Sequence, residues 1–314
     1  MMDCAIIGGG PAGLTAGLYL TRGGLKNVVV YEIGMLGGQI TKSSEIENYP
    51  GFFDNSKTGM DFMDTWQKQC FNFGLKHKMN FVVGIEKQEN HFDIKMKDGT
   101  VEQAKTVIVA TGSNPKSAGV RGEDKYYGKG ISSCATCDGF FHRNKVVGVI
   151  GGGDTALEEA YFLSNICKEV NVYYRKDNFD KVAPSTVERA RKKENINLII
   201  NSIAEEMIGD GDTLSSVSIL NTKTQEKSHL DVSGLFVFVG HDVNNGLLKD
   251  KDGNFICEVS KSGQVIVDLN MKTNVKGLFV AGDLRINAPK QVVSAAGDGS
   301  IAALEVISYL QELE

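Results

Sequence analysis

The chain has 314 residues, 41% hydrophobic and 23% charged, a composition typical of a folded globular protein with about two domains. Its formal net charge of −5 argues against a nucleic-acid-binding protein, which would carry a basic face. No apolar run reaches the roughly 18 residues of a membrane span, and the N-terminus Met1-Met2-Asp3 lacks the features of a signal peptide, so we expect a cytoplasmic protein that binds no membrane.

The first predicted unit lies at the N-terminus. A β-branched strand leads into Gly8, Gly10 and Gly13, which form GxGxxG ahead of an apolar pattern of helical period. Such glycines allow a tight turn and close contact between the backbone and a pyrophosphate, which the helix N-terminus attracts. The next predicted strand, Asn27–Glu32, ends 19 residues beyond Gly13 at Glu32. A carboxylate there binds ribose hydroxyls and repels a 2′-phosphate, so this unit suits FAD or NAD.

The segment SCATCDGFF, residues 133–141, contains two cysteines three positions apart, Cys134 and Cys137. A structural zinc site needs four ligands, and the sequence offers no second such pair; His142 alone cannot complete the set. A structural disulfide over so short a loop removes little unfolded-state entropy and is disfavoured in the cytosol. The spacing therefore favours a redox-active pair. The other cysteines stand in apolar contexts and are expected to be buried: Cys4, Cys70, Cys167 and Cys257.

The residues after the cysteine pair suggest supporting roles. Asp138 is interpreted as the acid–base group that exchanges a proton with a thiol or a cofactor, although it could also cap a helix N-terminus. Phe140 and Phe141 follow on a glycine turn. Two adjacent aromatic residues form either a docking patch for a partner protein or part of the core, and the sequence leaves both interpretations open.

A second copy of the first unit begins at Val147. The segment Val147–Leu163 aligns without gaps to Cys4–Leu20 at an offset of 143 residues, and Gly151, Gly153 and Ala156 form GxGxxA. The strand that follows, Glu169–Lys176, reaches Arg175, 19 residues beyond Ala156. The position that carries an acid in the first copy thus carries a cation in the second, which suits the 2′-phosphate of NADPH.

Signals that match the first unit lie on both sides of the second. Strand patterns at Thr106–Pro115, Gly234–Gly246 and Gly277–Leu310 flank the second unit, and the last one ends in a long apolar helix. We therefore predict an α/β fold of two Rossmann-like dinucleotide-binding domains, the second inserted into the first. The outer domain takes residues 1–116 and 245–314, and the inner domain takes residues 117–244. The turn-rich crossings suit a hinge.

On these motifs the chain resembles the low-molecular-weight bacterial thioredoxin reductases over essentially its whole length. The matching segments are GGGPAG, GGQITKSSEIENYPG (Gly37–Gly51), ATG at Ala110, CATCDGFF, GGGDTALEEA and GDLRINAPKQVVSAAGDG (Gly282–Gly299). The resemblance implies a homodimeric flavoenzyme in which NADPH gives a hydride to FAD. The flavin then reduces the Cys134–Cys137 disulfide, which in turn reduces thioredoxin. The outer domain would bind FAD, and the inner domain would bind NADPH and carry the cysteine pair.

The resemblance also implies the binding residues. The helix predicted to begin near Ala295 would point its N-terminus at the flavin. The FAD site would consist of Gly8, Gly10, Pro11, Ala12, Gly13, Glu32, Gly38, Gln39, Asn48, Ala110, Thr111, Gly112, Gly282, Asp283, Lys290, Gln291, Val292 and Ala295. The NADPH site would consist of Gly151, Gly153, Asp154, Thr155, Ala156, Arg175, Lys176 and Lys181. No metal site is expected.

The segment that would bind the 2′-phosphate departs from the family pattern, which is His-Arg-Arg with a third Arg four residues on. Here Tyr174, Arg175 and Lys176 are followed by Asp180, which reverses the third charge, although Lys181 could replace it. Lys176 keeps the charge but lacks the bidentate fork of arginine. The alternatives are therefore a reductase of this build that uses NADH, another donor or another small disulfide protein, and, more remotely, a non-catalytic nucleotide-binding redox sensor.

Overall fold

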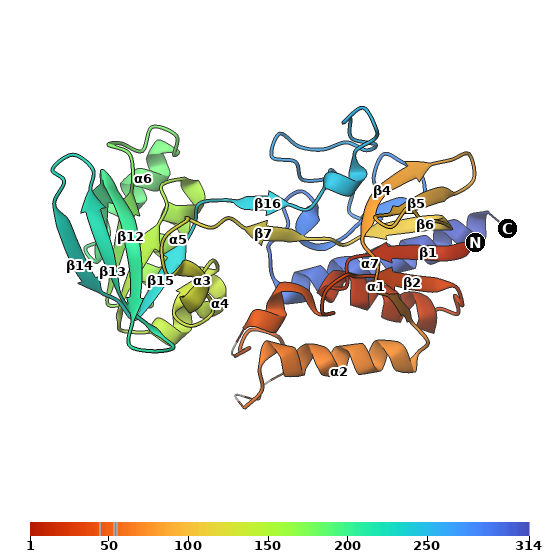
Figure 1. Ribbon diagram of the computed structural model, residues 1–314, viewed down its shortest axis with the longest axis horizontal. Coiled ribbons are helices and arrows are strands. Elements are labelled where there is room, and N and C mark those ends of the chain that lie inside the picture. Colours follow the sequence, from red (N-terminus) through yellow and green to blue (C-terminus); the bar gives the residue numbers. More distant parts are fainter. Residues whose placement is uncertain (44, 53, 55, 314) are drawn as a thin grey trace. The chain divides into compact units, whose positions relative to one another are not determined.

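The computed structural model describes residues 1–43, 45–52, 54 and 56–313 (Figure 1). The chain forms two compact units, one made of Met1–Asn114 and Val243–Glu314, the other of Pro115–Asp242. The chain passes between them in β7 (Ser113–Pro115) and β16 (His241–Val243), which pair with each other. Each predicted domain boundary lies two residues beyond the observed one. Ser44, within the Gly37–Gly51 motif, lies outside the described residues.

The outer unit is built on a sheet in which β3-β2-β1-β6-β5-β4 are neighbours in that order, and β17 also pairs with β6. β1, β2, β3, β6 and β17 run parallel, whereas β4, β5 and β6 form an antiparallel meander. The strands are β1 (Met2–Ile7), β2 (Val28–Tyr31), β3 (Lys76–Lys78), β4 (Val82–Lys87), β5 (Phe92–Met96), β6 (Val101–Val109) and β17 (Leu278–Val280). The helices are α1 (Pro11–Arg22), α2 (Gly59–Asn72) and α7 (Val292–Glu312), with short 3-10 turns η1 (Gly38–Lys42), η3 (Gly246–Leu248) and η4 (Gly282–Leu284).

Alternating residues of β1 explain how both faces of this sheet are buried. Cys4 and Ile6 belong to the core that α1, α2 and α7 cover, whereas Ala5 and Ile7 belong to a second core on the opposite face. Successive side chains of a strand point to opposite faces, so a strand covered on both sides reads as a continuous apolar run. The Val28–Tyr31 strand follows the same rule, because all four residues are buried. The apolar run at the N-terminus therefore forms the centre of the unit.

The inner unit repeats this plan on a smaller sheet. Its parallel strands lie in the order β11-β10-β9-β15-β8, and an antiparallel sheet β12-β13-β14 packs beside them in the same unit. The strands are β8 (Ile131–Ser132), β9 (Val146–Ile150), β10 (Glu169–Tyr174), β11 (Ile196–Ile200), β12 (Ser202–Gly209), β13 (Leu214–Asn221), β14 (Lys227–Asp231) and β15 (Gly234–Val237). The helical segments are α3 (Glu123–Tyr126), α4 (Ala135–Asp138), η2 (Gly139–His142), α5 (Asp154–Ser164) and α6 (Pro184–Arg191).

The fold bears out the α/β prediction of two Rossmann-like units. In both units the first strand, the glycine turn and the following helix come in the expected order, with β1 and α1 in one and β9 and α5 in the other (Figure 1). One boundary differs, because the final helix begins at Val292, three residues before the predicted Ala295. Gln291 takes extended backbone angles (φ −118°, ψ 144°) and ends the preceding turn, so the helix follows at once.

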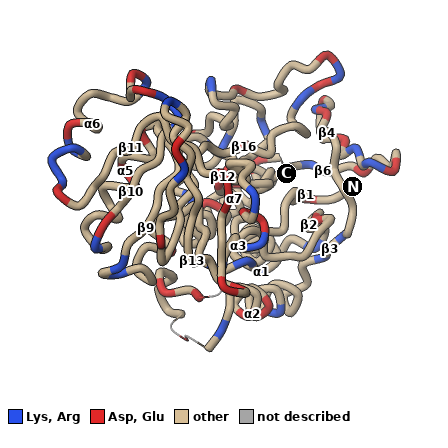
Figure 2. The backbone as a smooth tube through the Cα atoms, turned by 60° about the vertical axis from the view of Figure 1, so that its left-hand side comes forward, with Lys and Arg blue, Asp and Glu red and all other residues tan. Residues whose placement is uncertain are grey.

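Surface charge and helix length bear on partners. Lys and Arg residues alternate with Asp and Glu residues along the backbone of both units (Figure 2). Among the described helices, none has the length and apolar character that crossing a bilayer requires.

Candidate functional site

In the first glycine turn, packing leaves no room for a side chain at the outer glycines, Gly8 and Gly13, but leaves room at the middle one, Gly10. Gly8 has φ +108°, and a Cβ added there would lie 2.3 Å from the Ala110 carbonyl oxygen. A Cβ on Gly13 would lie 1.9 Å from the Gly8 carbonyl oxygen. Above Gly10, in contrast, the nearest atom is the Gly38 Cα at 3.9 Å. The protein itself does not fill the space over Gly10, which fits a turn that brings its backbone against a pyrophosphate.

The second glycine turn has the same property. A Cβ on Gly151 would lie 2.5 Å from the Phe238 carbonyl oxygen, and one on Gly152 would enter the Tyr174 ring at 1.9 Å. A Cβ on Gly153 would meet no atom within 4 Å. Ala156, the last residue of the motif, is fully buried. Both turns therefore leave an open cradle over their middle glycine, at the start of α1 and of α5, where helix N–H groups are free to bind phosphate.

Glu32 lies at the end of β2 beside the first glycine turn. Its carboxylate accepts a hydrogen bond from the backbone N–H of Gly9 at 3.0 Å and another from that of Gly34, also at 3.0 Å. The side chain is thus held against the turn before any ligand arrives. A carboxylate in this position is suited to accept hydrogen bonds from ribose hydroxyls.

The turn after β6 is held by an asparagine that the sequence analysis did not single out. The hydroxyl of Thr111 donates to the Asn244 carbonyl at 2.7 Å, and the Asn244 side chain donates back to the Thr111 carbonyl at 2.8 Å. Asn244 also accepts a hydrogen bond from Asn114, whose side chain in turn accepts one from Gln39. Gly112, between these residues, takes φ +65°. A polar network within the outer unit therefore connects the ATG turn to Gln39.

The C-terminal motif approaches the same glycine turn from another direction. A Cβ on Gly282, which has φ +75°, would lie 3.1 Å from the Ala12 Cβ and 3.7 Å from the Ala295 Cβ. At the N-cap of α7, Gln291 accepts a hydrogen bond from the Asn48 side chain at 3.2 Å. The structure thus brings together the starts of α1 and α7, the η4 turn and the Asn48 loop.

Asp283 and Lys290 also belong to this part of the outer unit. Burial raises the pKa of Asp283, and the nearby Lys290 ammonium opposes that shift. Lys290 itself adopts φ +57°, which places it in a tight turn before α7. These two side chains supply the opposite charges of the predicted FAD site.

The predicted redox pair forms a disulfide in the inner unit. Cys134 is the N-cap residue of α4, and Cys137 is its third residue. The Cys134 Sγ accepts a hydrogen bond from the backbone N–H of Cys137 at 3.2 Å and lies 3.4 Å from the Thr136 hydroxyl. Within the described part of the chain, no group of three or more His, Cys, Asp or Glu side chains could hold a metal ion. The environment of Cys134 favours negative charge on its sulfur.

Asp138 is the last residue of α4, directly after the cysteine pair. Burial raises the pKa of its carboxyl, and a hydrogen bond with Ser132 works in the opposite direction. Asp138 does not cap α4, whose N-cap is Cys134. It is the N-cap residue of the following η2 turn, but its side chain makes no capping hydrogen bond there. A carboxyl with a raised pKa next to a disulfide can donate a proton at a pH where an ordinary aspartate cannot.

The two phenylalanines after the pair differ in exposure. Phe140 is 55% exposed, and the Arg143 guanidinium lies 5.7 Å from the centre of its ring. Phe141 is only partly exposed. An exposed aromatic ring beside a cation offers a contact for another protein, so the docking role of Phe140 and Phe141 stays a prediction with Phe140 as its better-placed member.

The remaining cysteines are buried, as predicted. Burial raises the pKa of Cys4 and Cys70 to about 12, and that of Cys167 and Cys257 to about 11. Thiols with such pKa values are poor nucleophiles at neutral pH. Thiol chemistry therefore concentrates at the Cys134–Cys137 pair.

The segment after β10 lies where the sequence predicts 2′-phosphate binding. Tyr174 is buried and stacks on Phe179, with ring centroids 4.9 Å apart. Arg175 and Lys181 are exposed, and so is Asp180. Lys176 is exposed as well.

The end of this segment is nevertheless tied to the second glycine turn. The backbone N–H of Ala183 donates to the Asp154 carboxylate at 3.0 Å, at the first residue of α5. The neighbouring Thr155 is exposed at the same helix start. The Tyr174 ring, in turn, packs against Gly152. Two contacts therefore hold the 175–183 segment beside the cradle over Gly153.

Comparison with known proteins agrees with these features. The model of the pyridine nucleotide-disulphide oxidoreductase family matches residues 2–299. The chain is 58% identical to a thioredoxin reductase of Helicobacter pylori over 311 residues, 99% of each chain, and 40% identical to one of Peptoclostridium litorale, over 99% of this chain and 98% of that one. The crystal structure of thioredoxin reductase from Streptococcus pyogenes superimposes with a TM-score of 0.93 at 35% identity, covering 99% of each chain.

Proposed function

The chain belongs to the pyridine nucleotide-disulphide oxidoreductase family and, within it, to the thioredoxin reductases, and we propose that it reduces thioredoxin with electrons from NADPH, using FAD as its cofactor. The observation that carries the proposal is the coexistence, in one chain, of two open glycine cradles and a Cys134–Cys137 disulfide. The family relationship and the 58% identity to a thioredoxin reductase support it. The outer unit would bind FAD, and the inner unit would bind NADPH.

The residues of the outer unit fit FAD. When bound, FAD accepts a hydride from a reduced nicotinamide and passes two electrons on to a disulfide. The cradle over Gly10 would hold the pyrophosphate, and Glu32 would accept hydrogen bonds from ribose hydroxyls. Asp283 and Lys290 would bind further along the cofactor. The N-terminus of α7 would place a partial positive charge near the flavin.

The Cys134–Cys137 pair would carry the electrons onward. Two electrons break the disulfide and leave two sulfurs that together take up protons from solvent and from nearby acids. The backbone N–H of Cys137 and the Thr136 hydroxyl support a thiolate on Cys134. That thiolate attacks the disulfide of thioredoxin to form a mixed disulfide, which Cys137 resolves. The products are dithiol thioredoxin and the Cys134–Cys137 disulfide, so electrons and sulfur bonds balance.

Asp138 would manage the proton in this exchange. Because burial raises the pKa of its carboxyl, the protonated form persists closer to neutral pH than in an ordinary aspartate. Protonating a departing sulfur makes it a better leaving group, and the resulting carboxylate can take the proton back from a thiol in the reverse step. Phe140 would contact thioredoxin during the exchange, and the reductase would act as a homodimer.

The donor has one specific alternative. Asp180 stands where the family pattern has an arginine, and Arg175 is the one arginine that matches it. An exposed carboxylate near a dianionic 2′-phosphate weakens binding, though solvent screens part of the repulsion. A reductase of the same build that accepts NADH is therefore the second candidate.

Side-by-side reduction separates the two donors. Purified protein with bound FAD is mixed anaerobically with NADPH or NADH in a stopped-flow instrument, and the bleaching of flavin absorbance is followed. The proposal expects faster reduction by NADPH at equal concentration. Faster reduction by NADH would replace the donor, and failure of both would refute nicotinamide-dependent catalysis.

A further inference from the structure

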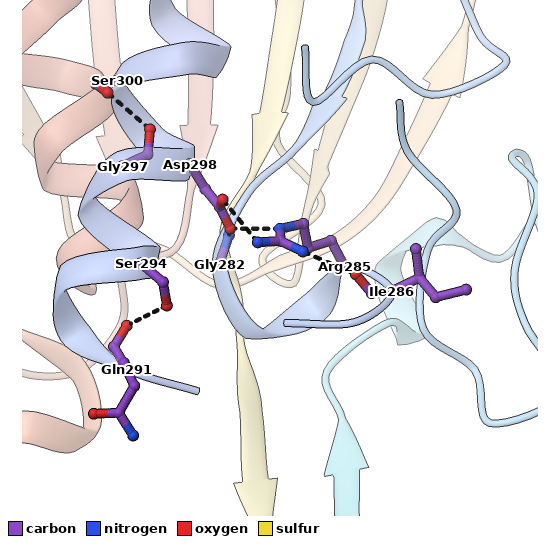
Figure 3. A network of polar contacts seen from close by, with 8 residues as sticks. All are labelled: Gly282, Arg285, Ile286, Gln291, Ser294, Gly297, Asp298 and Ser300. Carbon is purple, nitrogen blue, oxygen red and sulfur yellow. Dashed lines mark hydrogen bonds and ion pairs between the residues drawn. The ribbon is translucent and has the colours of Figure 1, made fainter. Parts of the chain in front are cut away.

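A buried ion pair lies directly behind the turn that carries Asp283. The Arg285 guanidinium donates from Nε to Asp298 Oδ2 at 2.6 Å and from Nη2 to Oδ1 at 3.0 Å (Figure 3). The Arg285 side chain is 16% exposed, and that of Asp298 is 7% exposed. A two-pronged pair of this kind fixes orientation as well as distance, because the planar fork of arginine matches the carboxylate.

The Asp298 carboxylate also binds the backbone of the η4 turn. The backbone N–H of Gly282 donates to Asp298 Oδ2 at 3.1 Å, and Arg285 donates from Nη1 to the Ile286 carbonyl at 3.0 Å (Figure 3). Asp283 lies between Gly282 and Arg285 in the chain. The two residues that bracket Asp283 are thus both fastened to one carboxylate on α7.

The next residue of α7 contacts the first glycine turn. A Cβ on Gly299 would lie 2.2 Å from the Ala12 carbonyl oxygen, so α7 touches the first turn of α1 without intervening side chain. Gly282 contacts Ala12 as well. Two adjacent residues of α7 therefore contact two parts of the site: Asp298 binds the turn that carries Asp283, and Gly299 packs against the start of α1.

We propose that the Arg285–Asp298 pair is a positioning device for the flavin cofactor: it holds the Asp283 carboxylate at a fixed distance from the glycine cradle, so that both can bind one FAD molecule. The inference rests on the proposed FAD-dependent function and deepens it. Arg285 and Asp298 are positioning residues, since each acts through the turn between Gly282 and Arg285. Loss of the Asp298 charge leaves a buried guanidinium unpaired and the turn free to move.

The test measures FAD binding to apoprotein by titration of flavin fluorescence, together with the thermal unfolding of the same apoprotein. Asp298→Asn should raise the Kd for FAD about tenfold or more, by analogy with the loss of metal affinity when the partner behind a metal ligand is removed. Arg285→Lys, which keeps the charge but not the fork, should raise it by a smaller factor. The control is Glu305→Gln, also on α7, which breaks the partly exposed ion pair between Glu305 and Lys272 and should leave the Kd unchanged.

A double variant separates positioning from simple stabilisation. Arg285→Met with Asp298→Leu replaces the buried pair by apolar side chains, an exchange that often preserves stability. We expect the unfolding temperature of the apoprotein to return toward wild type while the Kd for FAD stays raised and the visible circular dichroism of the bound flavin stays altered. Recovery of FAD affinity along with stability would overturn the inference.

The failure of this inference differs from failure of the proposed function. If wild-type apoprotein takes up FAD and Asp298→Asn takes it up with the same Kd, the inference alone is refuted. If the wild-type apoprotein takes up no FAD, the proposed function fails and the positioning role fails with it. Binding of NADP⁺ to the inner unit should be equal in all variants, and a loss there would show general disruption and refute the assigned role.

Discussion

Changing each of two neighbouring glycines of the second turn to alanine should have different effects: Gly152→Ala should lower stability, and Gly153→Ala should weaken dinucleotide binding. Gly153 takes extended angles (φ −99°, ψ 177°) that alanine also adopts, and an added Cβ would meet no atom within 4 Å. Gly153→Ala should therefore change the free energy of unfolding by no more than about 1 kcal/mol, the usual size of such a change at an N-cap. At Gly152 the added Cβ would lie 1.9 Å from the Tyr174 ring. Gly152→Ala should therefore cost about 1–3 kcal/mol through overpacking.

Gly153→Ala, which should leave stability nearly unchanged, should weaken dinucleotide binding. A methyl group over the cradle keeps the pyrophosphate away from the helix N–H groups and removes a hydrogen bond to a charged group. Such a loss is about 1.5–3 kcal/mol, or roughly a tenfold to hundredfold increase in Kd. Calorimetric titration with NADP⁺ and thermal unfolding by circular dichroism measure both quantities on the same sample. The matched variant Gly10→Ala should weaken FAD instead and leave NADP⁺ binding alone. Wild-type affinity for NADP⁺ in a well-folded Gly153→Ala protein would refute the assignment of this turn.

Four further variants test the thiol site, the inner core and the donor. A group whose folded pKa is raised stabilises the fold at low pH and loses that contribution as pH rises through the folded pKa. Because burial raises the pKa of Asp138, Asp138→Asn should unfold at an equal or higher temperature than wild type at pH 7.5, while its rate of thioredoxin reduction falls by about 10²–10⁴. A lower unfolding temperature with full activity would contradict both expectations. Burial, reinforced by Lys145, lowers the pKa of His142 from 6.5 to about 4. The neutral imidazole therefore contributes stability above pH 6.5 that is lost as the pH falls toward 4, and because the side chain is partly exposed this contribution stays below the roughly 3 kcal/mol that the full shift would give. The free energy of unfolding of His142→Phe, measured with a chemical denaturant, should fall less steeply than that of wild type as the pH is lowered over this range, and an unchanged pH dependence would argue against a neutral buried imidazole. Arg175→Ala should raise the KM for NADPH about tenfold and leave the KM for NADH unchanged, whereas Asp180→Arg should lower the KM for NADPH. Steady-state assays with both donors measure these values. An equal effect of Arg175→Ala on the KM of both donors would show that Arg175 does not bind the 2′-phosphate.

The sequence predicts the fold well because both nucleotide-binding units are local patterns. A short apolar strand, a glycine turn and a helix fall within about 20 residues, and the same signal recurs at Val147. Packing confirms the reason for the outer glycines, since Gly8 and Gly13 have no room for a side chain. The start of α7 lies three residues before the predicted one, because Gln291 ends the preceding turn through its backbone conformation and carries no sequence signal that distinguishes it.

The supports of the site could not be predicted in the same way. Asn244 bonds to Thr111 across 133 positions of sequence, and Arg285 meets Asp298 through the fold of a turn onto a helix. Such partners are polar residues in ordinary surroundings until the tertiary fold brings them together. The capping roles near Asp138 are hard to predict for a related reason. Which residue begins a one-turn helix depends on backbone angles, and Cys134 takes the extended ones, whereas Asp138 stands at the N-cap of η2 without a side-chain hydrogen bond.

The most direct test of the proposed function follows the electrons from NADPH to the Cys134–Cys137 pair. Purified FAD-loaded protein is reduced anaerobically with NADPH, alkylated with iodoacetamide, digested and analysed by mass spectrometry. We predict that alkylation appears at Cys134 and Cys137 in step with NADPH consumed, and that the buried cysteines stay unlabelled. Consumption of NADPH with the Cys134–Cys137 disulfide intact would contradict electron transfer to this pair.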